Sequence, residues 1–181
     1  YMAEDGGCWR MYNFVEDTFS ISELTSAEDF KSAALSFGNF QKLLADYPIE
    51  TLYDTIPNFH NTPSRFNDFK VALEQNLSGR KDEAQPEIDF VLARENDCGV
   101  IVEMLEKGEL PLRVTHNDTK LNNILFDNET KKGLCVVDLD TVMPGSSLYD
   151  FGDSIRFGAN TAAEDEKDLS KVSLSLEYFK A

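Results

Sequence analysis

Three polar side chains that could take part in a chemical reaction lie close together in the sequence, within residues 114–127. They are Asp118, Lys120 two positions later and Asn123 five positions later. A fourth, Asp138, follows an apolar run farther along the chain. Transfer of a phosphoryl group to a hydroxyl needs a carboxylate that accepts the hydroxyl proton, cations near the transferred group, and oxygen ligands for Mg²⁺. We therefore predict Asp118 as the base, Lys120 as the cation at the γ-phosphate of ATP, and Asn123 and Asp138 as the metal ligands.

The residues around this set indicate how it is positioned. Apolar runs at 124–126 and 134–137 flank a polar turn at 128–133. This pattern predicts a loop, then a short β-hairpin, with Asp138 at the tip of the second strand. From His116 the loop has the spacing His-x-Asp-x-x-x-x-Asn, which is typical of the catalytic loop of kinases.

Three motifs in this part of the chain carry a resemblance to a known family. They are His116-Asn117-Asp118-Thr119-Lys120-Leu121-Asn122-Asn123, Val137-Asp138-Leu139-Asp140-Thr141-Val142-Met143-Pro144-Gly145, and Tyr149-Asp150-Phe151-Gly152-Asp153-Ser154-Ile155-Arg156. In this order they resemble the aminoglycoside phosphotransferase / choline kinase superfamily, which has a protein-kinase-like fold. Within it, they are most similar to N-acetylhexosamine 1-kinase-like sugar kinases.

The resemblance implies an α+β fold with a mainly helical large (C-terminal) lobe and a short β-hairpin at the catalytic site. Residues 1–25 would be the last strand of the small lobe and a hinge remnant, and residues 26–181 the helical catalytic lobe, incomplete at its C-terminus. Backbone groups near Val15, Glu16 and Asp17 would face the adenine of ATP. The family's phosphate-binding small lobe is not in this sequence, so we expect the chain alone to transfer phosphate poorly or not at all.

The sequence also contains a second aspartate in a kinase-like context, at Asp150-Phe151-Gly152. It does not follow the hairpin directly, so we assign the metal to Asp138. In the resemblance Asp150 supports the catalytic loop by hydrogen bonds, and His116 braces the loop through its ring. We expect Asp153 to cap the following helix. Arg156 could pair with Asp153 or with a carboxylate in the loop, and a contact with phosphate is a less favoured alternative.

The sequence says less about the molecule that receives the phosphate. The resemblance favours the anomeric hydroxyl of an N-acetylhexosamine, with Asn117, Asp140, His60 and Arg65 as candidate acceptor contacts. Another small alcohol, such as an aminoglycoside or choline, remains open, because an acidic protein suits a cationic acceptor. A third alternative is a non-catalytic binding domain derived from a kinase, although the intact set of Asp118, Asn123 and Asp138 argues against it.

Bulk properties narrow the classes of partner. A chain of 181 residues with 41% hydrophobic residues can form one sizeable core. The net charge of −16 disfavours nucleic acid and anionic membranes as partners. Three cysteines without CxxC spacing suggest reduced thiols in the cytoplasm, and no apolar run is long enough to span a membrane.

Periodicity predicts the remaining elements. Residues 8–16 alternate in polarity and predict a strand. Apolar residues at helical spacing predict a helix over 27–46, a helix capped by Thr62, helices near 87–96 and 99–107, and a helix from Tyr149 through Ile155. We also expect a turn at 144–147 and a final helix from Leu169 to Ala181.

Overall fold

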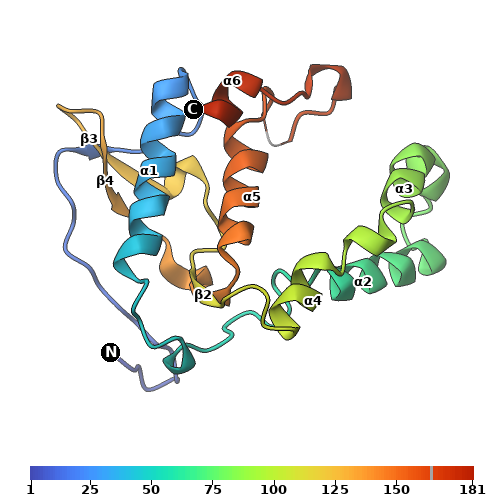
Figure 1. The fold of residues 1–181 in the computed structure, drawn as a ribbon, viewed down its shortest axis with the longest axis horizontal. Helices are drawn as coiled ribbons and strands as arrows, with labels where there is room; N and C mark the ends of the chain where they lie inside the picture. Colours follow the sequence, from blue (N-terminus) through green and yellow to red (C-terminus); the bar gives the residue numbers. More distant parts are fainter. Residues whose placement is uncertain (164) are drawn as a thin grey trace.

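The computed structural model describes residues 1–163 and 165–181, and it confirms an α+β fold in which helices dominate (Figure 1). The helices are α1 Ala27–Leu43, α2 Thr62–Gln75, α3 Gln85–Leu92, α4 Val100–Glu106, α5 Ser147–Gly158 and α6 Leu176–Lys180. The strands are β1 Thr18–Phe19, β2 Arg113–Thr115, β3 Ile124–Asp127, β4 Gly133–Val136 and β5 Met143–Gly145.

Two small antiparallel sheets flank the predicted loop. One has the strand order β1-β3-β4, with the predicted hairpin β3–β4 paired through Ile124↔Val136 and Leu125↔Cys135. The other pairs β2 with β5. The chain between β2 and β3 therefore starts in one sheet and ends in the other, so both of its ends are fixed.

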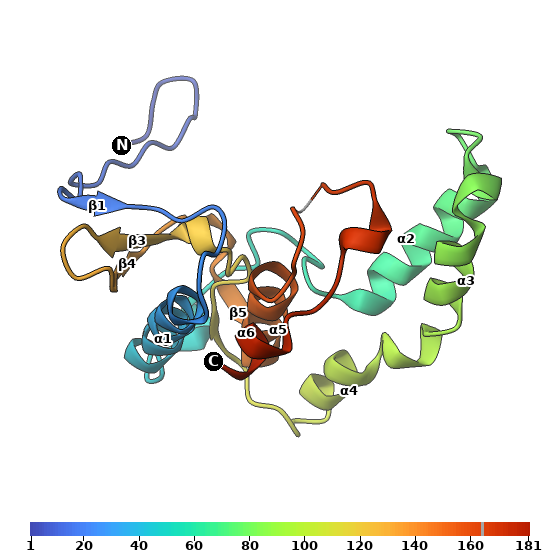
Figure 2. The same cartoon turned by 90° about the horizontal axis from the view of Figure 1, so that it is seen from above.

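The core forms where α1 packs against the hairpin. Its buried members are apolar residues of α1 and of the segment that enters β3: Phe30, Ala33, Phe37, Leu121, Ile124 and Phe126. The Ser32 hydroxyl of α1 accepts a hydrogen bond from the Gly133 N–H at 3.1 Å, which fixes the start of β4 on the helix. Figures 1 and 2 show α5 beside α1, on the other side of the loop from the hairpin.

Helix α1 begins where the capping pattern predicts. The Ser26 side chain accepts a hydrogen bond from the Asp29 N–H, as in a capping box. The Asp29 carboxylate accepts one from the Thr25 hydroxyl at 2.7 Å, and this bond lowers the pKa of Asp29. The helix ends at Leu43, three residues before the predicted end at 46.

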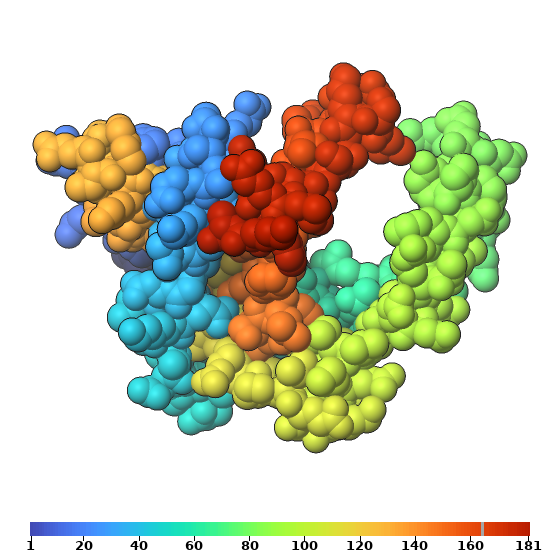
Figure 3. Space-filling view, turned by 45° about the horizontal axis from the view of Figure 1, so that its top comes forward, coloured from blue at the N-terminus to red at the C-terminus, as the bar shows by residue number. Residues whose placement is uncertain are grey.

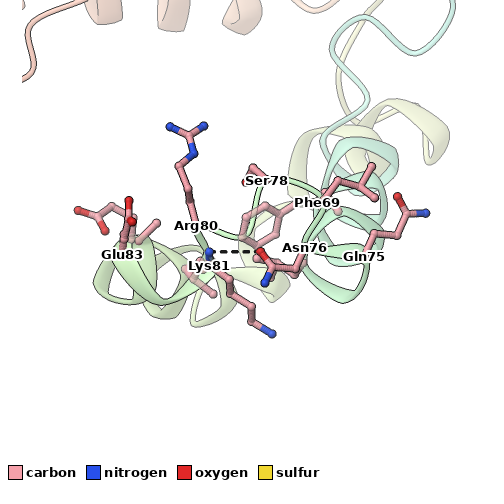
Figure 4. Close-up of a pocket in the computed structure, with 13 residues that line it drawn as sticks. Phe69, Gln75, Asn76, Ser78, Arg80, Lys81 and Glu83 are labelled. Carbon is pink, nitrogen blue, oxygen red and sulfur yellow. Dashed lines mark hydrogen bonds between the residues drawn. The ribbon is translucent and has the colours of Figure 1, made fainter.

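Helices α2, α3 and α4 form an arm that projects from the rest of the molecule (Figure 2). Helix α2 begins one residue before the predicted position, and its cap is Asn61, whose side chain accepts a hydrogen bond from the Ser64 N–H. Thr62, which we expected to be the cap, is the first residue of the helix. The arm holds a cavity of about 700 Å³ between α2 and α3, and the Asn76 side chain bonds the Lys81 N–H at its edge (Figure 4).

Three predictions about local structure are wrong. Residues 8–16 form no strand; the paired strand in this region is β1, and Asp17, with a φ of +55°, separates it from the preceding residues. The expected turn at 144–147 overlaps β5, because Pro144 pairs with Val114. The expected final helix is reduced to α6, since a bridge between Asn160 and Leu174 holds the preceding segment in a loop.

Among residues 1–163 and 165–181, we find no helix that is both long and apolar enough to cross a membrane.

Gly158 gives a test of how tightly α1 and α5 pack. A methyl group at Gly158 would overlap the buried ring of Phe30, whereas one at Gly152 in the same helix would meet nothing within 4 Å. We expect Gly158→Ala to destabilise the protein by about 1–3 kcal/mol through overpacking. Gly152→Ala is the matched control and should be neutral or stabilising by up to about 1 kcal/mol. Thermal unfolding measures both, and equal melting temperatures for the two variants would contradict this packing.

Candidate active site

Asp118 and Asn123 are held together by direct hydrogen bonds. The Asn123 Nδ2 donates to the Asp118 backbone oxygen at 2.8 Å and to the Asp118 Oδ2 at 3.0 Å. A 3₁₀ turn at Leu121–Asn123 brings Asn123 back toward Asp118. Because both bonds use the amide nitrogen, the Oδ1 of Asn123 is the atom left to act as a ligand for a cation.

Lys120 lies on the other side of the Asp118 carboxylate. Its Nζ is 3.5 Å from the Asp118 Oδ1, and the two side chains are 30% and 26% exposed. The pair is thus partly open to solvent, as a base must be if a hydroxyl is to reach it. A salt bridge this exposed contributes little to stability, about 0–1 kcal/mol, so Lys120 can turn toward a phosphate at small cost.

Asp150, in the first turn of α5, supports the loop between β2 and β3. Its buried carboxylate accepts hydrogen bonds from the N–H groups of His116 at 3.0 Å and Asn117 at 2.7 Å, and from the side chain of Gln41 in α1. Its backbone oxygen accepts one from the Thr119 hydroxyl at 2.8 Å. This carboxylate therefore joins α1, the loop and the first turn of α5, where a negative charge also suits the helix dipole.

Asp153 lies one turn farther along α5 and also bonds the loop. Its Oδ2 accepts from the Thr119 N–H at 2.8 Å, and its Oδ1 accepts from Arg156. The expected role of Asp153 as a helix cap is wrong, because Ser146 caps α5 and Asp153 lies inside the helix.

The ring of His116 connects the loop with the strand that leads to Asp138. The ring is fully buried, and the edges of Phe37 and Phe40 contact it. Its Nδ1 accepts from the Asp118 N–H at 3.4 Å, and its Nε2 lies 3.0 Å from the Val137 oxygen. An acceptor at Nδ1 and a donor at Nε2 require the neutral ring with its proton on Nε2.

Asp138 follows β4 in a left-handed conformation, with a φ of +59°, and its side chain is exposed. The N–H of Val137 donates to the backbone oxygen of Asn123 at 2.9 Å. Asp138 directly follows Val137, and this bond therefore holds the backbone of Asp138 near that of Asn123. One carboxylate and one amide oxygen fit Mg²⁺, which usually keeps several waters and binds phosphate oxygens. The described residues contain no group of three or more His, Cys, Asp or Glu side chains suited to a metal.

Of the predicted acceptor contacts, Asn117 points into the protein. It has a φ of +68° and is buried, and its Nδ2 donates to the Thr141 oxygen at 2.8 Å and to the Thr115 oxygen at 3.4 Å. Asp140 is exposed and forms an ion pair with Arg10.

The other two predicted acceptor contacts lie in the loop before α2. The Nε2 of His60 is 3.2 Å from the Asn117 backbone oxygen, and its ring stacks on Tyr149 with 4.8 Å between centroids. Burial raises the pKa of the Tyr149 hydroxyl, which stays neutral in this stack. Arg65 donates to the Phe59 backbone oxygen at 2.7 Å and lies over the Phe59 ring.

The predicted adenine contacts lie beside the turn of the hairpin, where Asp127 pairs with Thr18. The backbone oxygen of Val15 accepts from the Thr18 hydroxyl, and that of Asp17 accepts from the Asn128 N–H at 2.9 Å. Glu16 is exposed between them. The structure thus brings together the residues of the loop and Asp138, while residues 15–17 form a separate group.

Several residues that hold the loop were not anticipated from the sequence. Gln41 is the clearest, because a polar residue directly beside the apolar stripe of α1 is a detectable signal. The hydroxyls of Thr119 and Thr141 are two others; Thr141 donates to the His116 backbone oxygen at 2.7 Å. Threonines in loops are too common for their type alone to reveal such a role.

A cavity of about 760 Å³ opens next to Lys120. It lies between the residues before α1, the loop at 120–122, the C-terminal half of α5 and α6. Figure 3 shows a wide opening between the C-terminal segment and the arm, and no residue of the arm's helices lines the cavity. The charged side chains that line it are Lys120, Arg156, Glu23 and Glu177, and its neutral polar lining includes Asn122, Asn160, Thr161 and Ser175.

Comparison with known protein families agrees with this geometry. The family model described as "Phosphotransferase enzyme family" matches residues 18–171, which include the loop, the hairpin, Asp138 and α5. This match covers most of the chain and supports ATP-dependent phosphoryl transfer to an alcohol group. Asp118 and the hydrogen bonds that orient it thus lie inside a chain that belongs to the phosphotransferase enzyme family.

Proposed function

We propose that the protein is a kinase that uses Mg²⁺ and ATP to phosphorylate a sugar hydroxyl, and that this is the anomeric hydroxyl of an N-acetylhexosamine. One observation carries the kinase part of the proposal: Asn123 orients the Asp118 carboxylate through its amide nitrogen and keeps its oxygen for a cation. A base and a metal ligand are thereby fixed in one unit.

In this mechanism Asp118 accepts the proton of the acceptor hydroxyl. The hydroxyl oxygen forms a bond to the γ-phosphorus, the bond from that phosphorus to the β–γ bridging oxygen breaks, and ADP leaves. Lys120, beside Asp118, places a positive charge near the transferred group. Asn123 and Asp138 would hold Mg²⁺, which neutralises charge on the phosphate oxygens when bound.

The nucleotide would bind toward residues 15–17, with their backbone groups facing adenine, so that residues 1–25 act as strand and hinge and residues 26–181 as the catalytic lobe. This assignment rests on the family resemblance. All three cysteines have free thiols, which supports a cytoplasmic location.

The cavity beside Lys120 supports a neutral polar acceptor. Among the described residues, two cationic and two carboxylate side chains line it, so the cavity is mixed in charge although the whole chain carries −16. Its amide and hydroxyl groups suit the hydroxyls of a sugar. The choice of N-acetylhexosamine rests on the resemblance of the segment Asp138–Gly145 to the sugar kinases.

A cationic acceptor, such as an aminoglycoside or choline, is the second candidate. The net charge favours it, because an acidic protein attracts cations over a distance. In that case Glu23 and Glu177 would contact the cation at the cavity.

The first test uses Asp118→Asn in the full-length protein. This change keeps the shape of the side chain but removes its ability to accept a proton. We expect ADP release with N-acetylglucosamine or N-acetylgalactosamine to fall by about 10²–10⁴-fold, as for loss of a general base. Galactose, choline and kanamycin complete the acceptor panel.

Turnover on choline or kanamycin alone would move the protein to the second candidate. Full activity of Asp118→Asn would contradict the assignment of the base. Glu129→Gln, in the exposed hairpin turn, is the matched control for loss of one carboxylate and should leave turnover unchanged.

The second test concerns the metal. We expect Asp138→Asn to raise the Mg²⁺ concentration for half-maximal activity by about ten-fold or more, because one of two protein ligands loses its charge. A Mg²⁺ titration at fixed ATP measures this, again with Glu129→Gln as the control. An unchanged Mg²⁺ dependence would show that Asp138 is not a ligand.

A further inference from the structure

The peptide group between Asn117 and Asp118 is bonded at both ends by histidines. Its oxygen faces the Nε2 of His60 at 3.2 Å, and its N–H donates to the Nδ1 of His116 at 3.4 Å. The chain contains only these two histidines. His116 is adjacent in sequence, whereas His60 comes from a loop that precedes α2 and reaches this peptide from a distant part of the chain.

His60 itself is held firmly. Its ring stacks on Tyr149 of α5 and meets the edge of the Phe59 ring, each with 4.8 Å between centroids. The neighbouring backbone is fixed as well, because Arg65 bonds the Phe59 oxygen and Asn61 caps α2. The ring is therefore a fixed donor and not a mobile surface side chain.

His60 bonds the backbone oxygen of Asn117, and the orientation of this peptide group determines how the chain enters Asp118. Asn117 has a left-handed backbone, which costs roughly 1–2 kcal/mol for a residue with a Cβ and so needs support from its surroundings. Asp150 bonds the N–H of Asn117, and the Asn117 side chain bonds the oxygen of Thr141. Of the contacts in the described residues, only that of His60 reaches the Asn117 backbone oxygen.

We infer that His60 is a positioning residue for Asp118, and that it does not bind the acceptor. By donating from Nε2 to the Asn117 oxygen, it sets the plane of the peptide that leads into Asp118, and thereby the direction of the Asp118 carboxylate. This inference rests on the proposed function, in which Asp118 is the base.

The experiment compares two substitutions in the full-length protein. His60→Phe keeps an aromatic ring against Tyr149 but has no N–H to donate. His60→Gln loses the ring but can donate from its amide. We expect His60→Phe to lower kcat about ten-fold with KM for acceptor and ATP unchanged within about two-fold, because a misdirected base slows chemistry and not binding. His60→Gln should recover most of kcat.

A raised acceptor KM with normal kcat in His60→Phe would overturn the inference and make His60 an acceptor contact. Wild-type kcat and KM in His60→Phe would overturn it as well. Asp118→Asn is measured alongside, and its loss of activity supports Asp118 as the base. If His60→Phe has wild-type kinetics while Asp118→Asn is inactive, the inference about His60 is rejected and the proposed function is not.

A second measurement uses the wild-type protein and does not depend on enzymatic activity. In a nitrogen-15 spectrum of the wild-type protein, the two histidine rings give the only imidazole signals, and the buried His116 supplies one set. We expect His60 to show a visible, slowly exchanging Nε2–H proton, because this proton is held in the hydrogen bond to the Asn117 oxygen. A His60 ring whose Nε2–H exchanges freely with solvent, or is protonated on Nδ1 alone, would contradict the hydrogen bond.

Discussion

The buried carboxylate of Asp150 is the constraint on which the rest of the structure depends. A carboxylate removed from water is costly unless hydrogen bonds replace its hydration. Asp150 satisfies this need with two backbone N–H groups of the loop between β2 and β3 and with Gln41 of α1. The loop, α1 and the first turn of α5 can therefore reach their native positions only together, since each supplies part of what the carboxylate requires.

The conformation around Asp118 follows from this constraint. Asp150 holds the N–H groups of residues 116 and 117, and Asn117 takes a left-handed conformation before the peptide that leads to Asp118. Two further bonds hold this arrangement: the Asn123 side-chain amide donates to the Asp118 backbone oxygen, and the Val137 N–H donates to the Asn123 backbone oxygen. The backbone around the proposed base and the proposed metal ligands is consequently held by hydrogen bonds to main-chain atoms.

The sequence could predict the parts of this arrangement that depend on local patterns. The hairpin, the start of α1, and α5 follow from apolar periodicity, caps and turn residues, and the structure confirms them. It could not predict β5, because the pairing of Pro144 with Val114 depends on two segments that are distant in the chain. For the same reason, the alternating polarity of residues 8–16 led to a wrong prediction of a strand. A strand needs a partner to pair with, and alternating polarity alone does not supply one.

The candidate site divides in the same way. The types and spacing of Asp118, Lys120, Asn123 and Asp138 suggested a chemistry, because phosphoryl transfer needs those groups. Other contacts join residues from separate elements. They are the hydrogen bonds of Gln41 and Thr141 to the site and the contact of His60 with the Asn117 oxygen. Such contacts depend on the folded packing of α1, α5 and the loop before α2, and no spacing in the chain encodes them.

The residues that hold Asp118 and the residues that line the cavity overlap only in part, at Lys120. Asp118 is held by bonds within the loop, which Asp150 supports from α5, whereas about half of the cavity lining comes from connections, at residues 22–24, 160–163 and 175. Loops accept substitutions with less effect on stability than a bonded core does. In the proposed function, the acceptor preference can therefore change through cavity residues such as Asn160 and Thr161 while Asp118 keeps its geometry. For that reason, the acceptor is harder to infer than the reaction.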